Sequence, residues 1–185
     1  MDHFLPWVGE NYNSQQKKIM ILGESHYWDD EFWDGETKFV VEDYLKKKEL
    51  RFFTSLTKIC LDKTKLTREE KNDFWHSVLF YNYIPENLGK QGDRPSKEQF
   101  QKGFEPFKKI LNEYKPNYIL VCGKQLWDNI PPEFGEEEGQ KYYFWWFPIE
   151  GGKKAMAACI YHPSRYPKGY GNMNPREIFK KLLSY

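Results

Sequence analysis

Three residues suited to chemistry lie at the ends of short apolar segments in this 185-residue chain: Glu24, Asn82 and His162. A carboxylate can position water, and an amide offers both hydrogen-bond donors and an acceptor. A neutral imidazole can donate a hydrogen bond to an oxygen that gains negative charge. If the fold brings these groups together, they indicate a hydrolytic or ligand-binding site.

The segments between these residues predict the elements that position them. Short apolar runs predict strands at residues 17–23, 77–84, 117–122, 142–148 and 155–161. Apolar residues at helical spacing predict helices at residues 37–61 (in one or two pieces), 67–75, 96–114, 124–129 and 174–183. Capping patterns support two of these helix starts, Thr67 with Glu70 and Ser96 with Gln99. The acidic residues 136–138 predict a solvated turn.

Strands that alternate with helices predict a mostly parallel central sheet covered on both faces, a three-layer α/β/α sandwich. We expect residues 1–185 to form one domain of this class. Ligands of such sheets bind outside the carboxyl ends of the strands. The segments to consider are therefore those that follow the strands: residues 23–27 (GESHY), 82–85 (NYIP), 123–125 (GKQ) and 162–165 (HPSR).

Composition narrows the class of protein. The chain has 28 Lys and Arg against 27 Asp and Glu, so a nucleic-acid partner would be held by a local patch rather than by a field of one sign. Three scattered cysteines without a CxxC pair disfavour a disulfide framework and a cysteine-ligated metal. No apolar stretch approaches a membrane span, and residues 1–10 lack the features of a signal peptide. We expect a cytoplasmic monomer that contacts no membrane.

The order of these segments resembles that of the uracil-DNA glycosylase superfamily. Members of this family open with a strand that ends in a G-Q-D-P-Y-H, G-E-A-P-G or G-x-N-P-G loop, carry an Asn after a middle strand and close with an H-P-S loop. Residues 23–27, Asn82 and residues 161–165 fill these places, so the resemblance spans residues 17–165. Each motif alone is weak, and the specificity comes from their order and strand context.

The resemblance implies a uracil-DNA glycosylase-like fold and a DNA N-glycosylase without a metal or other cofactor. Such an enzyme flips uracil or a related deaminated base into a pocket and hydrolyses the bond between base and sugar. His162 would stabilise the departing base, or its ring is satisfied by local backbone. Glu24 would position water or steady the cationic sugar, or it forms an ion pair with a Lys or Arg.

The loop after the first strand departs from the family pattern. Ser25 stands where many members place the Asp or Asn that activates water, and serine is a weaker base. Glu24 would then carry this role, as in the G-E-A-P-G branch. His26 replaces the usual proline and either assists or packs. We therefore expect catalysis to involve Glu24, Ser25 and His162.

Substrate binding is expected from Gly23, His26, Tyr27, Phe39, Asn82 and Ser164. Asn82 matches the donor and acceptor on one edge of uracil, or it bonds the backbone at a strand end. Tyr27 lines up with the tyrosine that crowds out the methyl group of thymine in the G-Q-D-P-Y-H branch, or it is a half-buried aromatic residue. Either Trp33 or Phe39 could stack on the flipped base.

Contacts with DNA phosphates are expected from Arg165, Lys168 and Arg94, which follow the His162 and Asn82 loops. Charged loops are often merely solvated, so this signal is weak. A second interpretation is a module that binds DNA or a nucleotide without hydrolysis, suggested by Ser25 and by the near-neutral charge.

Two further possibilities rank lower. A serine hydrolase that pairs Ser25 with His26 or His162 is disfavoured, because adjacent residues at a strand end point apart. A zinc site at His26, His76 and His162 is also disfavoured, because the sequence contains no HxxxH or HExxH spacing.

Overall fold

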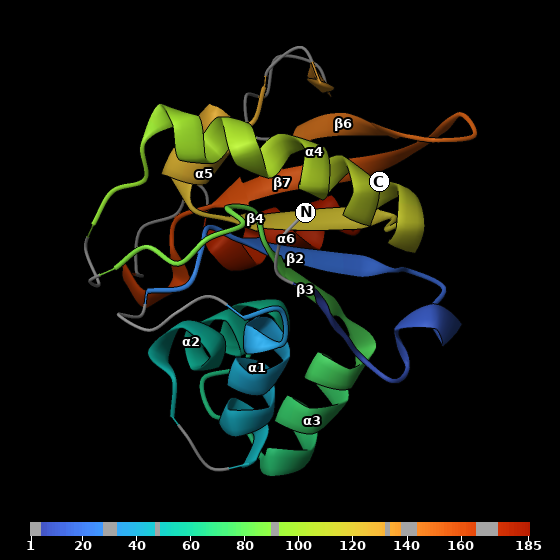
Figure 1. The fold of residues 1–185 in the computed structure, drawn as a ribbon. Helices are drawn as coiled ribbons and strands as arrows, with labels where there is room; N and C mark the ends of the chain where they lie inside the picture. The colour runs from blue at the N-terminus through green and yellow to red at the C-terminus, as the bar shows by residue number, and fades with distance from the viewer. Residues whose placement is uncertain are drawn as a thin grey trace.

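A seven-stranded sheet lies at the centre of the computed structural model, which describes residues 5–27, 33–46, 49–89, 93–131, 134–137, 144–165 and 174–185 (Figure 1). The strand order is β1-β3-β2-β4-β7-β6-β5. The strands are β1 (Trp7–Val8), β2 (Ile19–Gly23), β3 (Leu79–Asn82), β4 (Tyr118–Cys122), β5 (Glu136–Glu137), β6 (Phe144–Ile149) and β7 (Lys153–Ile160).

Four parallel strands, β3, β2, β4 and β7, form the middle of the sheet. Leu22 of β2 lies opposite Tyr81 of β3 and Val121 of β4, and all three side chains are fully buried. Strands buried on both faces read as continuous apolar runs, which is why the sequence predicts them without alternation. The expected α/β class is therefore confirmed.

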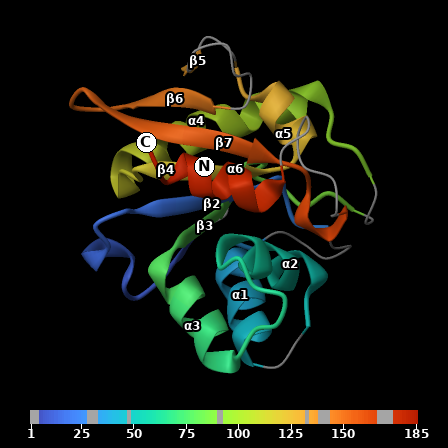
Figure 2. The same cartoon turned by 180° about the vertical axis from the view of Figure 1, so that it is seen from behind.

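Helices cover both faces of the sheet (Figure 2). One face carries α4 (Lys97–Tyr114) and α5 (Lys124–Asn129), and we call it the α4 face. The opposite face, here the α1 face, carries α1 (Glu36–Lys46), α2 (Arg51–Cys60), α3 (Arg68–Ser77) and α6 (Pro175–Leu182). Each face has its own buried cluster, so the structure has three layers.

Local capping sets the starts of the predicted helices. The Thr67 hydroxyl accepts the Glu70 N–H at 3.1 Å, and the Glu70 carboxylate accepts the Thr67 N–H at 2.9 Å. Ser96 and Gln99 make the same reciprocal pair at the start of α4. Both expected capping boxes are confirmed, because these bonds satisfy amide groups that have no partner inside the helix.

The edges of the sheet differ from the sequence-based expectation. Residues 136 and 137 form β5 rather than a solvated turn, and β1 was not expected at all. The three strands β1, β5 and β6 run antiparallel to their neighbours. Two residues are too few to show the alternating apolar pattern of a strand in the sequence. Strands as short as β1 and β5 form only because they pair with a neighbouring strand.

No helix in the described ranges is long and apolar enough to cross a membrane.

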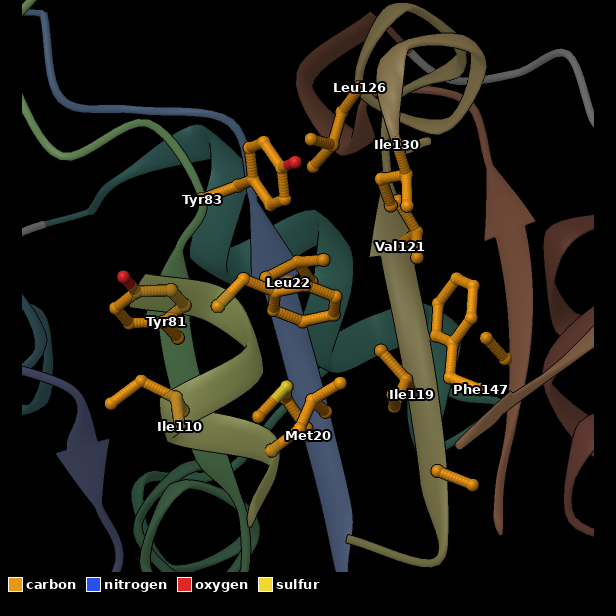
Figure 3. Packing of buried hydrophobic residues seen from close by; sticks show 14 of the residues in the cluster. Met20, Leu22, Tyr81, Tyr83, Ile110, Ile119, Val121, Leu126, Ile130 and Phe147 are labelled. Carbon is orange, nitrogen blue, oxygen red and sulfur yellow. The ribbon is translucent and has the colours of Figure 1, made fainter. Parts of the chain in front are cut away.

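The core on the α4 face is rich in aromatic rings (Figure 3). Figure 3 shows Met20 and Leu22 of β2 beside Ile119 and Val121 of β4, with Phe147 of β6 adjacent. Two tyrosines at the β3 edge, Tyr81 and Tyr83, are completely buried, and their hydroxyls have no hydrogen-bond partner among the described residues. A buried polar group without a hydrogen-bond partner lowers the stability of the folded protein.

We expect Tyr81→Phe to raise the free energy of unfolding by about 1 kcal/mol, because it removes an unpartnered buried hydroxyl. Tyr12→Phe is the matched comparison, since the equally buried Tyr12 hydroxyl donates to the Tyr114 carbonyl at 3.2 Å. This second change should lower stability by about 1 kcal/mol. Urea unfolding of the three proteins measures both effects, and equal losses in the two variants would contradict the assignment.

Candidate functional site

At the carboxyl end of β2, the segments that follow neighbouring strands turn to opposite faces of the sheet. The chain leaves β2 toward α1 on one face, whereas it leaves the flanking strands β3 and β4 toward α4 and α5 on the other. Loops that part in this way leave a crevice between them, and ligands of α/β sheets bind there. In Figure 1, the arrowhead of β7 points toward this carboxyl end of the parallel strands, which we call the carboxyl edge of the sheet.

Gly123 lies directly after β4, the strand between β2 and β7. Gly123 is buried and has a φ of 148°, and apart from its chain neighbours no described residue lies within 4 Å of the position that a Cβ would occupy. This φ favours glycine, because residues that carry a Cβ rarely adopt it. In the order of strands, β4 lies between β2 and β7, so the segments that follow these two strands flank Gly123 in the sheet.

Glu24 lies directly after β2 and is half-buried. Its Oε1 accepts a hydrogen bond of 2.6 Å from the Tyr27 hydroxyl. Burial raises the pKa of Glu24, while the Tyr27 hydrogen bond and the charge of Arg165 act in the opposite direction. Burial outweighs these two neighbours, so the pKa of Glu24 is raised from its ordinary value.

His162 follows β7 and begins the turn that contains the short helix η3 (Pro163–Arg165). Its Nδ1 accepts the Ser164 N–H at 3.3 Å, so Nε2 carries the proton of the neutral ring. Burial and then the charge of Arg165 lower the pKa of His162. The ring is a neutral donor whose centroid lies 5.2 Å from that of Phe52.

Arg165 connects the two sides electrostatically. Its charge opposes the burial that raises the pKa of Glu24, and it adds to the burial that lowers the pKa of His162. It also acts on Tyr27, whose pKa is raised mainly by burial. Glu24 and Tyr27 follow β2, and His162 and Arg165 follow β7, so the parallel strands place all four residues at the same end of the sheet.

Asn82 and His26 form a buried pair beneath this edge. The Asn82 Nδ2 lies 3.0 Å from the His26 Nε2, which also lies 3.0 Å from the Thr37 hydroxyl. Asn82 is 3% exposed, and a Cβ on Gly23 would lie 2.2 Å from its Oδ1. Asn82 thus packs against the glycine backbone and ties the ends of β2 and β3 to the start of α1.

Ser25 links two loops. Its hydroxyl donates to the Glu86 carbonyl at 2.6 Å, so its single proton is directed at the backbone. This geometry does not form the nucleophile and base pair of a serine hydrolase. Ser164 contributes its backbone N–H to His162.

The remaining predicted residues lie farther out. Phe39 and Trp33 are about half exposed, with ring centroids 5.9 Å apart. Arg94 is exposed on the loop that precedes α4. Lys168 lies outside the described residues, so its predicted role keeps the status of an expectation.

Three contacts of the site were not anticipated from the sequence. Thr37 contacts His26, Phe52 faces His162, and Asp93 is close enough to raise the pKa of Tyr27. The helical spacing of apolar residues predicts that Phe52 packs in the core. Its contact with His162, however, depends on the tertiary fold. Thr37 in α1 and Asp93 before α4 carry no sequence signal that distinguishes them from other polar residues.

A separate hollow of about 280 Å³ is lined by Lys108, Asn112, Phe134, Pro148, Ile149 and Glu150. It lies between α4 and the end of β6, at the edge where β7 begins and therefore opposite Glu24. This hollow contains none of the predicted site residues.

Within the described part of the chain, no group of three or more His, Cys, Asp or Glu residues is arranged to hold a metal ion. Comparison of the chain with protein-family models and with curated proteins finds no match. The functional interpretation therefore rests on the geometry of the site and on the resemblance of its motifs.

Burial lowers the pKa of His26 from its ordinary value of 6.5 to about 3. Between these values the unfolded chain binds a proton that the folded chain does not, so stability rises with pH in this window. We expect this histidine to lower the free energy of unfolding by about 2 kcal/mol between pH 7 and pH 5.

Unfolding of wild type and His26→Gln at both pH values isolates this contribution, and the variant should lose less stability on acidification. The imidazole resonances of wild type provide a direct check. A His26 ring that titrates near pH 6.5 in the folded protein would refute the assignment.

Proposed function

We propose that the chain is a DNA N-glycosylase with a uracil-DNA glycosylase-like fold, acting on uracil or a related deaminated base. The observation that supports the proposal is that Glu24 follows β2 and His162 follows β7 at the same end of the parallel strands, where the chain diverges to the two faces of the sheet. The Glu24 carboxylate can accept hydrogen bonds, and the neutral His162 ring can donate one through Nε2. Cleavage of a base from a sugar requires this pair of functions.

His162 serves the departing base. When the bond to the sugar breaks, the electron pair leaves with the base, and negative charge develops on a base carbonyl oxygen. A neutral Nε2–H donor stabilises this charge, and a partly buried site strengthens the interaction. The lowered pKa of His162 keeps the ring neutral at physiological pH.

Glu24 serves the sugar. Its ionised carboxylate stabilises the cationic character of the sugar and holds the water whose oxygen forms the new bond, while the water proton passes to the carboxylate. Because its pKa is raised, Glu24 is a stronger base than an exposed glutamate.

The other predicted residues have supporting roles in this proposal. Arg165, Arg94 and Lys168 contact DNA phosphates, and Tyr27 borders the base. The buried bond from Asn82 to His26 would need to rearrange before Asn82 could read a base edge. Gly23 allows this close packing, and Phe39 would offer an exposed ring to DNA.

The alternative is a module on the same fold that binds DNA or a nucleotide without hydrolysis. One observation favours it: the Ser25 hydroxyl is directed at the Glu86 carbonyl, so the residue at the place of the family's water-activating Asp or Asn makes a structural contact. Binding without turnover would then be the activity of the purified protein.

Base release from oligonucleotides that contain uracil or hypoxanthine tests the proposal. Glu24→Gln should reduce single-turnover base release by at least about 10²-fold, because it removes the base. His162→Ala should reduce it by about 10² to 10³-fold, because it removes the donor to the departing base. The control is Glu10→Gln, a carboxylate with an 82% exposed side chain, which should leave the rate unchanged.

Absence of base release from both single-stranded and double-stranded substrates would refute the glycosylase. Tight DNA binding that Glu24→Gln leaves unchanged, in the absence of turnover, would establish the alternative.

The pH profile gives a further test. Glu24 must be ionised to act as a base, so the rate should fall as the pH drops through its pKa, above the ordinary value of 4.5. Arg165→Gln removes a charge that holds this pKa down, so the acid limb should move to higher pH. Rates that are independent of pH between 4 and 8 in both proteins would contradict the assigned role.

A further inference from the structure

The Tyr27 side chain is directed toward Glu24 by several contacts. Its ring packs against the core cluster of the α4 face, and its hydroxyl donates to the Glu24 Oε1 at 2.6 Å. The phenol has a single proton to donate, so this bond uses it. The Tyr27 hydroxyl is therefore engaged inside the protein before any ligand binds.

The backbone on both sides of this bond is anchored to the segment that follows β3. The Ile84 N–H donates to the Glu24 carbonyl at 2.9 Å, and the Leu88 N–H donates to the His26 carbonyl at the same distance. These bonds limit movement of the loop that carries Glu24 and Tyr27. The hydrogen bond between the two side chains is thus partly buried and lies in a loop whose backbone is held at two points.

The other oxygen of the Glu24 carboxylate accepts no hydrogen bond from the described residues. A carboxylate held through one oxygen has its rotation restricted, and its second oxygen stays available for water or substrate. A hydrogen bond to the ionised form also favours ionisation, which counters the effect of burial. The Tyr27 hydroxyl therefore acts on both the direction and the ionisation of the Glu24 carboxylate.

We propose that Tyr27 is the positioning residue of Glu24, acting through its hydroxyl to orient the carboxylate and keep it ionised. This role differs from that of a ring that crowds out the thymine methyl group, because it depends on the hydroxyl alone. The expected effect of Tyr27 on the rate of base release rests on the proposed glycosylase function. Its expected effect on the orientation and ionisation of Glu24 does not depend on that function.

Tyr27→Phe separates the hydroxyl from the ring. Titration of protein labelled with ¹³C at the glutamate carboxyl groups, assigned with Glu24→Gln, follows Glu24 directly. We expect the pKa of Glu24 to rise by about 1 unit in Tyr27→Phe, the shift that corresponds to the loss of one hydrogen bond to a charged group. An unchanged Glu24 titration would overturn the inference, whether or not the protein is an enzyme.

Base release by the same variant tests the catalytic consequence. Tyr27→Phe should lower kcat by about 10-fold near neutral pH, leave KM nearly unchanged and move the acid limb upward. Discrimination between uracil and thymine should persist, because the ring remains. Loss of discrimination with an unchanged acid limb would assign Tyr27 to methyl exclusion and overturn the positioning role.

The matched control is Tyr118→Phe, at the start of β4 and therefore at the opposite edge of the sheet. It removes one phenolic hydroxyl and should alter neither the Glu24 titration nor base release. If wild type releases no base, the proposed function fails, and the carboxyl titration still decides the inference on Tyr27.

Discussion

The parallel pairing of β2 with both β3 and β4 is the constraint on which the rest of the structure depends. It requires three strands to end at one edge, and burial on both faces fixes their register, because a shift of one residue would turn apolar side chains away from their own core. The chain must then cross to opposite faces from neighbouring strands. The parallel register also places Glu24 and Asn82 together at the ends of β2 and β3.

Partial burial gives this edge its chemical character. The same desolvation raises the pKa of Glu24 and lowers that of His162, so both groups are pushed toward their neutral forms. Arg165 and the Tyr27 hydroxyl favour the ionised carboxylate, while Arg165 further disfavours a protonated imidazole. The result is a pair with unlike roles, a basic carboxylate and a neutral donor, held on loops from non-adjacent strands.

Beneath this pair, a second set of polar residues has a structural role. Asn82, His26 and Thr37 connect the ends of β2 and β3 with the start of α1, and Ser25 connects the same loop to Glu86. Position after a strand and the resemblance of the motifs made Asn82 and Ser25 candidates for a direct role in binding or catalysis. Their partners show that a polar residue after a strand can equally well join loops, and no local pattern separates these two uses.

The amino-acid sequence by itself determined the central strands, most helix boundaries and the capping boxes at Thr67 and Ser96, because these depend on apolar periodicity and on contacts three residues apart. It also placed Glu24 and His162 at strand ends. Only the tertiary structure decided the antiparallel edge strands, the engagement of Asn82 by His26 and the bond from Tyr27 to Glu24. These features arise from strand register and loop packing, which bring together groups whose proximity no short stretch of sequence encodes.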